Sequence, residues 1–374
     1  ARPAEYLVLM LYKHGAYQNK VWTLFFLQKK KRMRQHLELG QFLRKRYDGF
    51  LNQSYLRHEI TVRSTDYDRT LMSAEANLAG LYPPNGEQVF SPNIMWQPIP
   101  VHTVPQSEEK LLSFPQRDCP RFEELMNETE QTEEFRNVTA ANQDVLDLVR
   151  NKTGLKTMSV ESAWSVYDTL FCELRHNKSA PDWVTPSLWE RLHFLKDFGF
   201  QVLFGVYKQQ EKSRLQGGVF SAWFTKKKKK IFNHDTTVAA LQVSLNVFNG
   251  RQPPYASCHM IELYSDDNGS LTVSMFYRND STVEPYALQL PGCSLDCPLE
   301  DFVKITKLSI SEDRQKECQL PSSGRNQEVI ITLAVFGCLL LVLIVVLFLA
   351  MIRHKEPLGS QGYRQISREG ADES

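Results

Sequence analysis

Residues 6–12, YLVLMLY, form a continuous apolar run that ends at Lys13, His14 and Gly15. A run of this length without alternating polar residues is typical of a β-strand that is buried on both faces. Open α/β sheets bind their ligands just beyond the carboxyl ends of such strands. The stretch therefore predicts a central strand whose end presents Lys13 and His14 to a ligand.

The chain beyond this strand alternates between helical and strand patterns. Apolar residues recur at helical or strand spacing over residues 33–47, 59–62, 71–81, 236–248, 257–264 and 271–278. Strands that alternate with helices in this way imply a largely parallel sheet with crossover helices. We therefore expect an α/β fold with a mainly parallel sheet flanked by helices.

A segment of different composition interrupts this pattern. Residues 105–215 are rich in Glu, Gln, Asn and Leu, and helical patterns occur near residues 142–149, 160–171 and 188–212. We expect this segment to be a helical cap insertion. The α/β domain then consists of residues 1–104 and 216–320.

Residues 329–352 contain 24 consecutive residues without a charge. About 20 apolar residues suffice for a helix to cross the hydrocarbon core of a bilayer. Arg353, His354 and Lys355 follow, and a basic flank of this kind favours the cytosolic side. We expect a single-pass type I membrane protein with a stalk at residues 321–328, a cytoplasmic tail at residues 353–374, and a signal peptide already removed.

Two features place the large N-terminal part in an oxidising, luminal compartment. N-x-S/T sequons, the acceptors of N-linked glycans, occur before the apolar segment at Asn52, Asn127, Asn137, Asn151, Asn177, Asn268 and Asn279. The second feature is the six cysteines of this part, which suit disulfide formation in an oxidising compartment and allow 15 pairings. A seventh cysteine, Cys338, lies in the apolar segment.

The tail contains Tyr363 followed three residues later by Ile366. A tyrosine and a bulky aliphatic residue at this spacing can dock as an extended peptide into a sorting adaptor. We expect this motif to direct the protein to its membrane.

The overall composition limits the function. The 374 residues are 42% apolar, which suits a large globular core, and the formal net charge is only +1. A nucleic-acid-binding protein usually carries a clear basic excess. We therefore expect no nucleic-acid partner.

The residues at the expected strand ends suit phosphoryl transfer. They are Lys13, His14, Arg63, His234 and Asp235. A neutral imidazole can attack phosphorus, cations stabilise the charge that spreads over the phosphoryl oxygens, and a carboxylic acid can protonate the departing alkoxide. This chemistry requires neither a metal ion nor a cofactor.

Longer stretches of the chain carry a family resemblance. They are VRSTDYDRTLMSAEANLAGLYPPNG from Val62, SPNIMWQPIPVHTVP from Ser91, VYDTLFCE from Val166, EKSRLQGGV from Glu211, HDTTVAALQ from His234 and NGRQPPYASCHMIELY from Asn249. Through them the chain resembles the histidine acid phosphatases over nearly its whole length. The resemblance implies hydrolysis of phosphate monoesters at acidic pH through a phosphohistidine, in a homodimer at the lysosomal membrane with a luminal catalytic domain.

The resemblance also implies a role for each site residue. His14 is the expected nucleophile and Asp235 the proton donor. Arg63, His234 and, by position, Lys13 are the expected phosphate ligands, and His102 is a possible lining residue of the site. The disulfides that the resemblance implies are Cys119–Cys318, Cys172–Cys258 and Cys293–Cys297.

Two segments depart from the family pattern. Around the nucleophile the family has R-H-G-x-R-x-P, whereas this chain has Lys13, Tyr17 and Asn19 in place of the two arginines and the proline. Residues 226–230 are five consecutive lysines where the family has an apolar strand. Because the desolvation of such charges is costly, we expect that this run does not form a buried central strand. An altered gene, an imperfect gene sequence or a solvated loop would each explain these segments.

Two other functions fit the same sequence. A catalytically silent, glycosylated lysosomal membrane protein would keep the fold without the activity. A cell-surface adhesion or receptor module is supported only by the sequons and the apolar segment.

Glycosylation tests the expected topology. We expect glycosidase treatment to lower the apparent mass of a fragment cut before Val329, because all seven sequons precede that residue. Gel mobility before and after treatment measures the change, and an unchanged mass would contradict a luminal N-terminal part.

Overall fold

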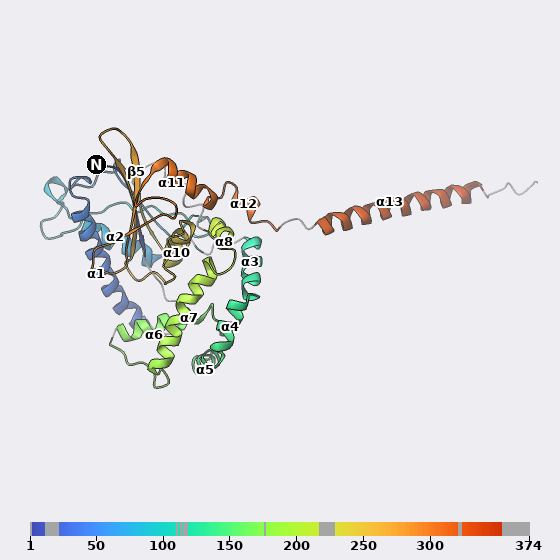
Figure 1. Cartoon of the computed structure of the whole chain (residues 1–374), viewed down its shortest axis with the longest axis horizontal. Helices are drawn as coiled ribbons and strands as arrows, with labels where there is room; N and C mark the ends of the chain where they lie inside the picture. Colours follow the sequence, from blue (N-terminus) through green and yellow to red (C-terminus); the bar gives the residue numbers. More distant parts are fainter. Residues whose placement is uncertain are drawn as a thin grey trace, which may run out of the picture. The chain divides into compact units, whose positions relative to one another are not determined.

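The computed structural model describes residues 2–11, 22–109, 111–112, 114, 119–175, 177–216, 229–320 and 324–353 (Figure 1). The chain divides into two compact units, Ala1–Gln319 and Leu320–Ser374. The first unit contains the sheet and the expected site residues. The second contains one long helix.

Among the described residues, seven strands form one sheet in the first unit. The strands are β1 (Arg2–Leu11), β2 (Thr61–Ser64), β3 (Lys229–Asn233), β4 (Cys258–Ser265), β5 (Leu271–Arg278), β6 (Tyr286–Leu288) and β7 (Asp296–Pro298). Their order is β2-β3-β1-β4-β5-β6, and β7 pairs with β5.

The sheet is mixed, which corrects the expectation of a mainly parallel sheet. β3 pairs in parallel with β1 and β2, whereas β4, β5, β6 and β7 join by antiparallel pairing. The reason lies in the connections. β4 and β5 form a hairpin closed at Asp266, whose backbone N–H donates to the carbonyl of Ser270 at 3.0 Å. A short turn of this kind can join only antiparallel strands, since parallel strands need a crossover.

The end of the lysine run forms part of a central strand, so our expectation for it is wrong at Lys229 and Lys230. These two residues begin β3, which lies between β1 and β2. The ladder bonds use only backbone groups, and the fully buried side chains of β3 are those of Ile231, Phe232 and Asn233. Lysine therefore occupies only the amino end of the strand. Residues 226–228 lie outside the described residues.

Helices cover both faces of the sheet. Phe232 and Met260 pack with α1 (Trp22–Arg46) and α2 (Asp68–Leu81), whereas their neighbours Ile231 and Ile261 pack with α10 (Asp235–Ser244). Successive side chains of a strand point to opposite faces, so one strand can contribute to two cores. The short elements α11 (Leu299–Thr306), α12 (Arg314–Glu317), η1 (Gly86–Gln88) and η2 (Lys307–Ser309) complete this part of the unit.

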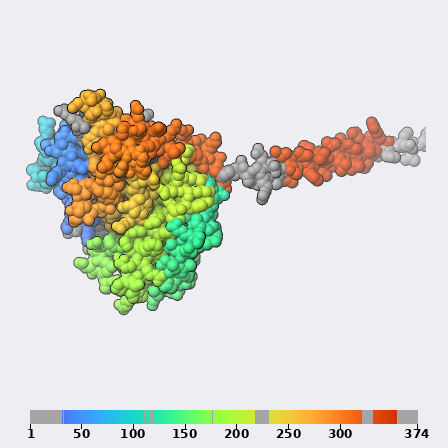
Figure 2. All heavy atoms as spheres, viewed as in Figure 1, coloured from blue at the N-terminus to red at the C-terminus, as the bar shows by residue number. Residues whose placement is uncertain are grey.

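The segment expected to form a cap is helical, and its helices lie together at one end of the unit, apart from the last one, which packs beside α10 (Figure 1). The helices are α3 (Pro120–Glu130), α4 (Glu133–Ala141), α5 (Gln143–Thr153), α6 (Ala163–Arg175), α7 (Pro186–Phe204) and α8 (Gln209–Gln216). Val149, Tyr167 and Leu192 belong to a buried cluster of their own. The space-filling view shows these green segments packed directly against the yellow and orange part of the chain (Figure 2).

The expected single helix over residues 188–212 is two helices, which is a further correction. The chain leaves the helical path after Phe204 and resumes it at Gln209. Val206 and Lys208 have φ angles of 57° and 46°, a left-handed conformation that ends a right-handed helix.

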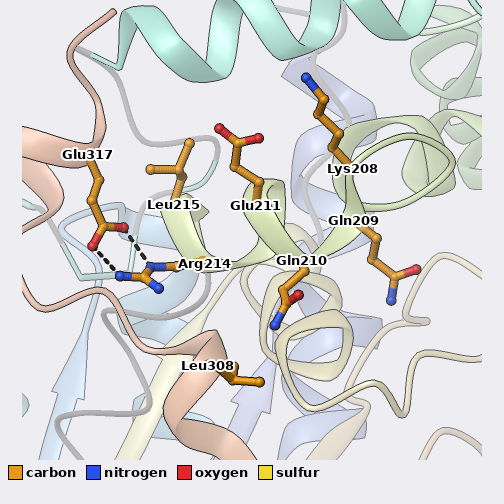
Figure 3. A pocket seen from close by; sticks show the side chains of 8 residues that line it. All are labelled: Lys208, Gln209, Gln210, Glu211, Arg214, Leu215, Leu308 and Glu317. Carbon is orange, nitrogen blue, oxygen red and sulfur yellow. Dashed lines mark hydrogen bonds and ion pairs between the residues drawn. The ribbon is translucent and has the colours of Figure 1, made fainter. Parts of the chain in front are cut away.

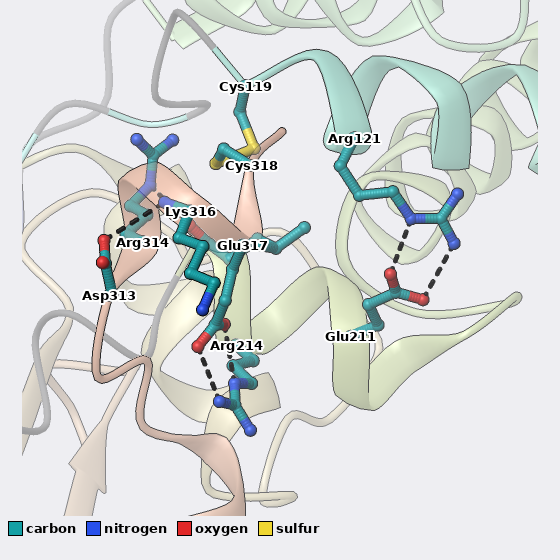
Figure 4. The surroundings of a disulfide bond; sticks show 10 residues. Cys119, Arg121, Glu211, Arg214, Asp313, Arg314, Lys316, Glu317 and Cys318 are labelled. Carbon is teal, nitrogen blue, oxygen red and sulfur yellow. Dashed lines mark hydrogen bonds and ion pairs between the residues drawn. A yellow bond between two sulfur atoms is a disulfide. The ribbon is translucent and has the colours of Figure 1, made fainter. Parts of the chain in front are cut away.

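Two of the three predicted disulfides are present. Cys119–Cys318 joins the start of α3 to the end of α12 across 199 residues, and Cys293–Cys297 closes a local loop. Ion pairs flank the longer bridge, with Arg121 bound to Glu211 at 2.7 Å and Arg214 bound to Glu317 at 2.6 Å (Figure 4). Cys172 and Cys258 are both buried, and the bond between them stays a prediction.

The second unit contains α13 (Gly324–Arg353). Its segment Ile331–Arg353 contains an 18-residue stretch with a mean hydropathy of 3.3, and the side chains of the segment are exposed. The helix is therefore long and apolar enough to cross a membrane, which agrees with the span expected at residues 329–352.

Helices α1 and α2 approach each other at two glycines. A Cβ atom on Gly40 would lie 2.1 Å from the backbone oxygen of Asn77, and one on Gly80 would lie 2.2 Å from the backbone oxygen of Leu37. Both distances are shorter than any real contact. The lack of a side chain at these positions therefore sets the spacing of the two helices.

We expect Gly40→Ala and Gly80→Ala each to lower the free energy of unfolding by about 1–3 kcal/mol, because a backbone must shift to accept the methyl group. Gly199→Ala in α7 is the matched control, since its Cβ would meet its nearest neighbour at 3.5 Å. Urea unfolding followed by circular dichroism measures the difference. Equal stability of the three variants would show that the close approach does not limit packing.

Candidate functional site

The parallel strands end at one edge of the sheet. Leu11 of β1 lies opposite Asn233 of β3, and Ser64 of β2 lies opposite Phe232. The chain that follows each strand therefore starts from the same edge. This register was expected from the pattern of strands and helices, and it places His234 and Asp235 there. Lys13, His14 and Tyr17 lie outside the described residues.

His234 is the N-cap residue of α10, and residues that follow β2 hold its ring. Its Nε2 atom lies 3.3 Å from the Oγ1 atom of Thr65. The ring of Tyr67 meets the imidazole edge to face, with 5.3 Å between the ring centroids. The loop after β2 therefore orients the histidine that begins α10.

Asp235 is the first residue of α10 and is 8% exposed. Its Oδ1 atom accepts a hydrogen bond from the backbone N–H of Thr236 at 3.0 Å. Its Oδ2 atom accepts one from Nε2 of Gln252 at 2.8 Å. Both carboxyl oxygens thus have a defined donor, and the side chain is fixed at the amino end of the helix.

Arg63 is bound to a buried carboxylate. Its Nη2 atom lies 3.0 and 2.9 Å from the two carboxyl oxygens of Glu109, whose side chain is 2% exposed. One of these oxygens also accepts the backbone N–H groups of Leu111 and Leu112 at 2.9 Å each. The guanidinium therefore anchors the segment that begins at Glu109, and its predicted role as a phosphate ligand stays a prediction.

The same segment supports the start of α10. The hydroxyl of Thr237 donates to the carbonyl of Leu112 at 2.8 Å, and the hydroxyl of Thr236 donates to that of Phe114 at 3.1 Å. The Arg63–Glu109 pair therefore supports the first turn of α10, which begins at His234 and Asp235.

Arg69 is a cation that the sequence interpretation missed. It lies in the first turn of α2, and the carbon of its guanidinium lies 4.1 Å from the centroid of the Tyr67 ring. Its Nε atom is buried and has no hydrogen-bond partner among the described residues. Burial lowers the pKa of Arg69, and the nearby Tyr67 and Asp235 act in the opposite direction.

A signal for Arg69 was present in the sequence. The stretch VRSTDYDRT contains a second arginine six residues after Arg63, at the expected start of the helix that follows a strand. The N-terminal turns of such helices attract anions through their exposed N–H groups and the helix dipole.

His102 lies beside β2. Its backbone N–H donates to the carbonyl of Val62 at 3.0 Å, and its carbonyl accepts from Ser64 at 2.9 Å. Its side chain is exposed. The backbone of this residue extends the sheet edge, and its role in lining the site stays a prediction.

The other predicted positions lie away from this edge or outside the described residues. The sequon asparagines are exposed, apart from Asn279, which is half-buried. Tyr363 and Ile366 lie outside the described residues. The absence of a metal or cofactor stays a prediction.

A surface groove of about 780 Å³ lies along α8 (Figure 3). Its charged groups are neutralised by neighbours. Lys208 binds Glu128 at 2.8 Å, and Arg214 binds Glu317 at 2.6 Å. Among the described residues that line the groove, none is a predicted site residue.

Comparison with known proteins supports the same family. A model described as the histidine phosphatase superfamily (branch 2) matches residues 32–223. The chain is 50% identical over 384 residues to lysosomal acid phosphatase of Homo sapiens. The alignment covers 96% of this chain and 90% of that relative. It is 47% identical over 311 residues to prostatic acid phosphatase of Bos taurus, with 80% of each chain covered.

Solved structures support the fold. Hafnia alvei phytase in complex with tartrate aligns with a TM-score of 0.59 at 17% identity, covering 86% of this chain and 100% of the phytase. Likeness at this identity shows the fold alone.

Proposed function

Because the chain belongs to branch 2 of the histidine phosphatase superfamily, we propose that it is an acid phosphatase that hydrolyses phosphate monoesters. One observation of the structure carries the proposal. Leu11 lies opposite Asn233, so the chain that leads to His14 starts beside the chain that leads to His234 and Asp235. The named activities of the relatives favour an enzyme over a silent protein that keeps the fold.

The proposed reaction has two steps. An imidazole nitrogen of His14 forms a bond to phosphorus, and the bond between phosphorus and the ester oxygen breaks. The carboxylic acid of Asp235 gives its proton to that oxygen, and the alcohol leaves. Water then attacks the phosphohistidine and loses a proton to the Asp235 carboxylate, which frees His14 and inorganic phosphate.

Arg69 is our proposed addition to the phosphate-binding cations. Its Nε atom is buried without a hydrogen-bond partner among the described residues, and burial lowers the pKa of Arg69 while the nearby charge of Asp235 acts in the opposite direction. Arg63, Lys13 and His234 complete the proposed set. Lys13 offers a point charge where the family has a two-pronged donor, so we expect a weaker hold on phosphate than in the family.

The chain is also proposed to be a type I protein of the lysosomal membrane. The apolar helix Ile331–Arg353 and the seven sequons before it support a luminal catalytic part. The name of the human relative supports the lysosome. Recognition of Tyr363 and Ile366 by a sorting adaptor is part of this proposal.

A homodimer is proposed as the functional unit. A short segment of the first unit exposes several large apolar side chains, which are Val89, Phe90, Ile94, Met95 and Trp96. A contiguous apolar patch on a protein surface marks a contact with a partner. A second copy of this chain is the partner that we propose.

Variants at the two arginines test the catalytic proposal. We expect the protein to hydrolyse p-nitrophenyl phosphate at acidic pH and to form an acid-labile phosphoenzyme that His14→Ala abolishes. Arg69→Ala should lower kcat/KM by roughly 10²–10³, because one preorganised cation is lost from the transition state.

Arg63→Ala is the matched comparison. It should lower kcat/KM less than Arg69→Ala does and should also lower the free energy of unfolding, by about 3 kcal/mol, because Glu109 keeps a buried charge without its cation. Full phosphoenzyme formation in His14→Ala would contradict the phosphohistidine. A greater loss of kcat/KM in a fully folded Arg63→Ala than in Arg69→Ala would assign the phosphate to Arg63.

The dimer is tested by Met95→Glu, which places a charge at a side chain that is 71% exposed. We expect this variant to sediment as a monomer in analytical ultracentrifugation, because burying the charge in the interface is costly. Leu308→Glu is the control, since Leu308 is 64% exposed but lies outside the patch. If Met95→Glu and Leu308→Glu sediment with the same molecular mass, the proposed interface is contradicted.

A further inference from the structure

Gln252 is a buried side chain in direct contact with the proposed proton donor. It is 5% exposed and lies in the connection between α10 and β4. Its Nε2 atom donates to Oδ2 of Asp235 at 2.8 Å, and both atoms are buried. The pair is therefore shielded from water. In such a buried environment, a hydrogen bond affects a charged group more strongly than it does in water.

The cap helix α7 holds Gln252 in place. The backbone N–H of Gln252 donates to Oδ1 of Asp197 at 2.9 Å, and Nζ of Lys196 binds the same oxygen at 2.9 Å. One turn further along α7, Nε2 of Gln201 donates to the carbonyl of Gly250 at 2.9 Å. Asp197 thus holds the backbone of Gln252 itself, whereas Gln201 contacts the chain two residues before it.

We propose that Gln252 is a positioning residue that orients the Asp235 carboxyl for proton transfer and that Asp197 of the cap sets the place of Gln252. This inference rests on the proposed phosphatase function, with Asp235 as the acid. It gives α7 a task in the reaction, because a hydrogen-bonded path leads from Asp197 of α7 through Gln252 to the acid.

The contact has a chemical consequence with a definite sign. An N–H donor stabilises the carboxylate form of Asp235 more than its acid form, so the contact makes the proton easier to give up. Without the donor, the acid form persists to higher pH. Activity that needs the protonated acid then declines at a higher pH than in the natural protein.

Other groups face Asp235 and remain in a Gln252 variant. Arg69 of α2 favours the carboxylate, and Tyr277 of β5 stays neutral because burial raises its pKa. His234 precedes Asp235 in the chain. Since these groups are unchanged, a difference between the variant and the natural protein reports the loss of the amide donor.

The test compares two substrates with different leaving groups in the full-length, detergent-solubilised protein. Glycerol 2-phosphate releases an alkoxide that needs a proton, whereas p-nitrophenyl phosphate releases a phenolate that is stable without one. We expect Gln252→Leu to lower kcat/KM for glycerol 2-phosphate about 10-fold and that for p-nitrophenyl phosphate less than about 3-fold. The alkaline limb of the kcat/KM profile should move up by roughly 0.5–1 pH unit.

Two further variants make the test specific. Gln252→Glu keeps the size of the side chain and should also move the alkaline limb upward, since a second carboxylate disfavours charge on Asp235. Gln201→Leu removes the other hydrogen bond between α7 and this segment. It should leave the ratio of kcat/KM for the two substrates unchanged. Asp197→Ala should change the ratio in the same direction as Gln252→Leu, by a smaller factor.

The outcomes separate this inference from the proposed function. If the natural protein hydrolyses neither substrate, the proposed function fails and this inference fails with it. If the natural protein is active and both Gln252 variants keep the same alkaline limb of the kcat/KM profile and the same ratio of kcat/KM for the two substrates, Gln252 is only a packing residue. In that case the inference alone is overturned.

Discussion

The parallel pairing of β3 between β1 and β2 is the constraint on which the rest of the first unit depends. β3 lies more than 150 residues after both β1 and β2 in the sequence, yet the pairing brings Leu11, Asn233 and Ser64 to one edge. Backbone hydrogen bonds form this ladder, so it tolerates two lysines at the start of β3. The apolar side chains of Ile231 and Phe232 then join the strand to the cores on both faces.

The start of α10 is held from several directions. The loop after β2 contacts His234, the segment after Glu109 accepts hydroxyl groups of the first turn, and Gln252 contacts Asp235. A group that gives and takes a proton has to be fixed within a fraction of an ångström of its partner, because misplacement lowers the rate steeply. These contacts support the proposed role of Asp235 as a proton donor.

The two arginines of VRSTDYDRT show how similar residues acquire different tasks. Arg63 is on the strand and reaches a buried carboxylate 46 residues away, so its charge is neutralised. Arg69 is on the following helix, where the ring of Tyr67 supports its guanidinium. The sequence pattern alone favoured Arg63, because it directly ends a strand. The contact between Arg63 and Glu109 became visible only with the fold.

The sequence by itself determined those features that depend on neighbouring residues. The apolar run at residues 6–12, the helical spacing of the helices, the hairpin of β4 and β5 and the long apolar segment are local patterns, and each could be predicted. The family motifs added the site residues and the disulfide partners. Three features were decided only by the tertiary structure: the antiparallel pairing of β1 with β4, the Arg63–Glu109 pair, and the path from Asp197 through Gln252 to Asp235. Each depends on groups that are distant in the chain, and a sequence pattern does not specify which of many polar side chains will meet when their strands and helices pack.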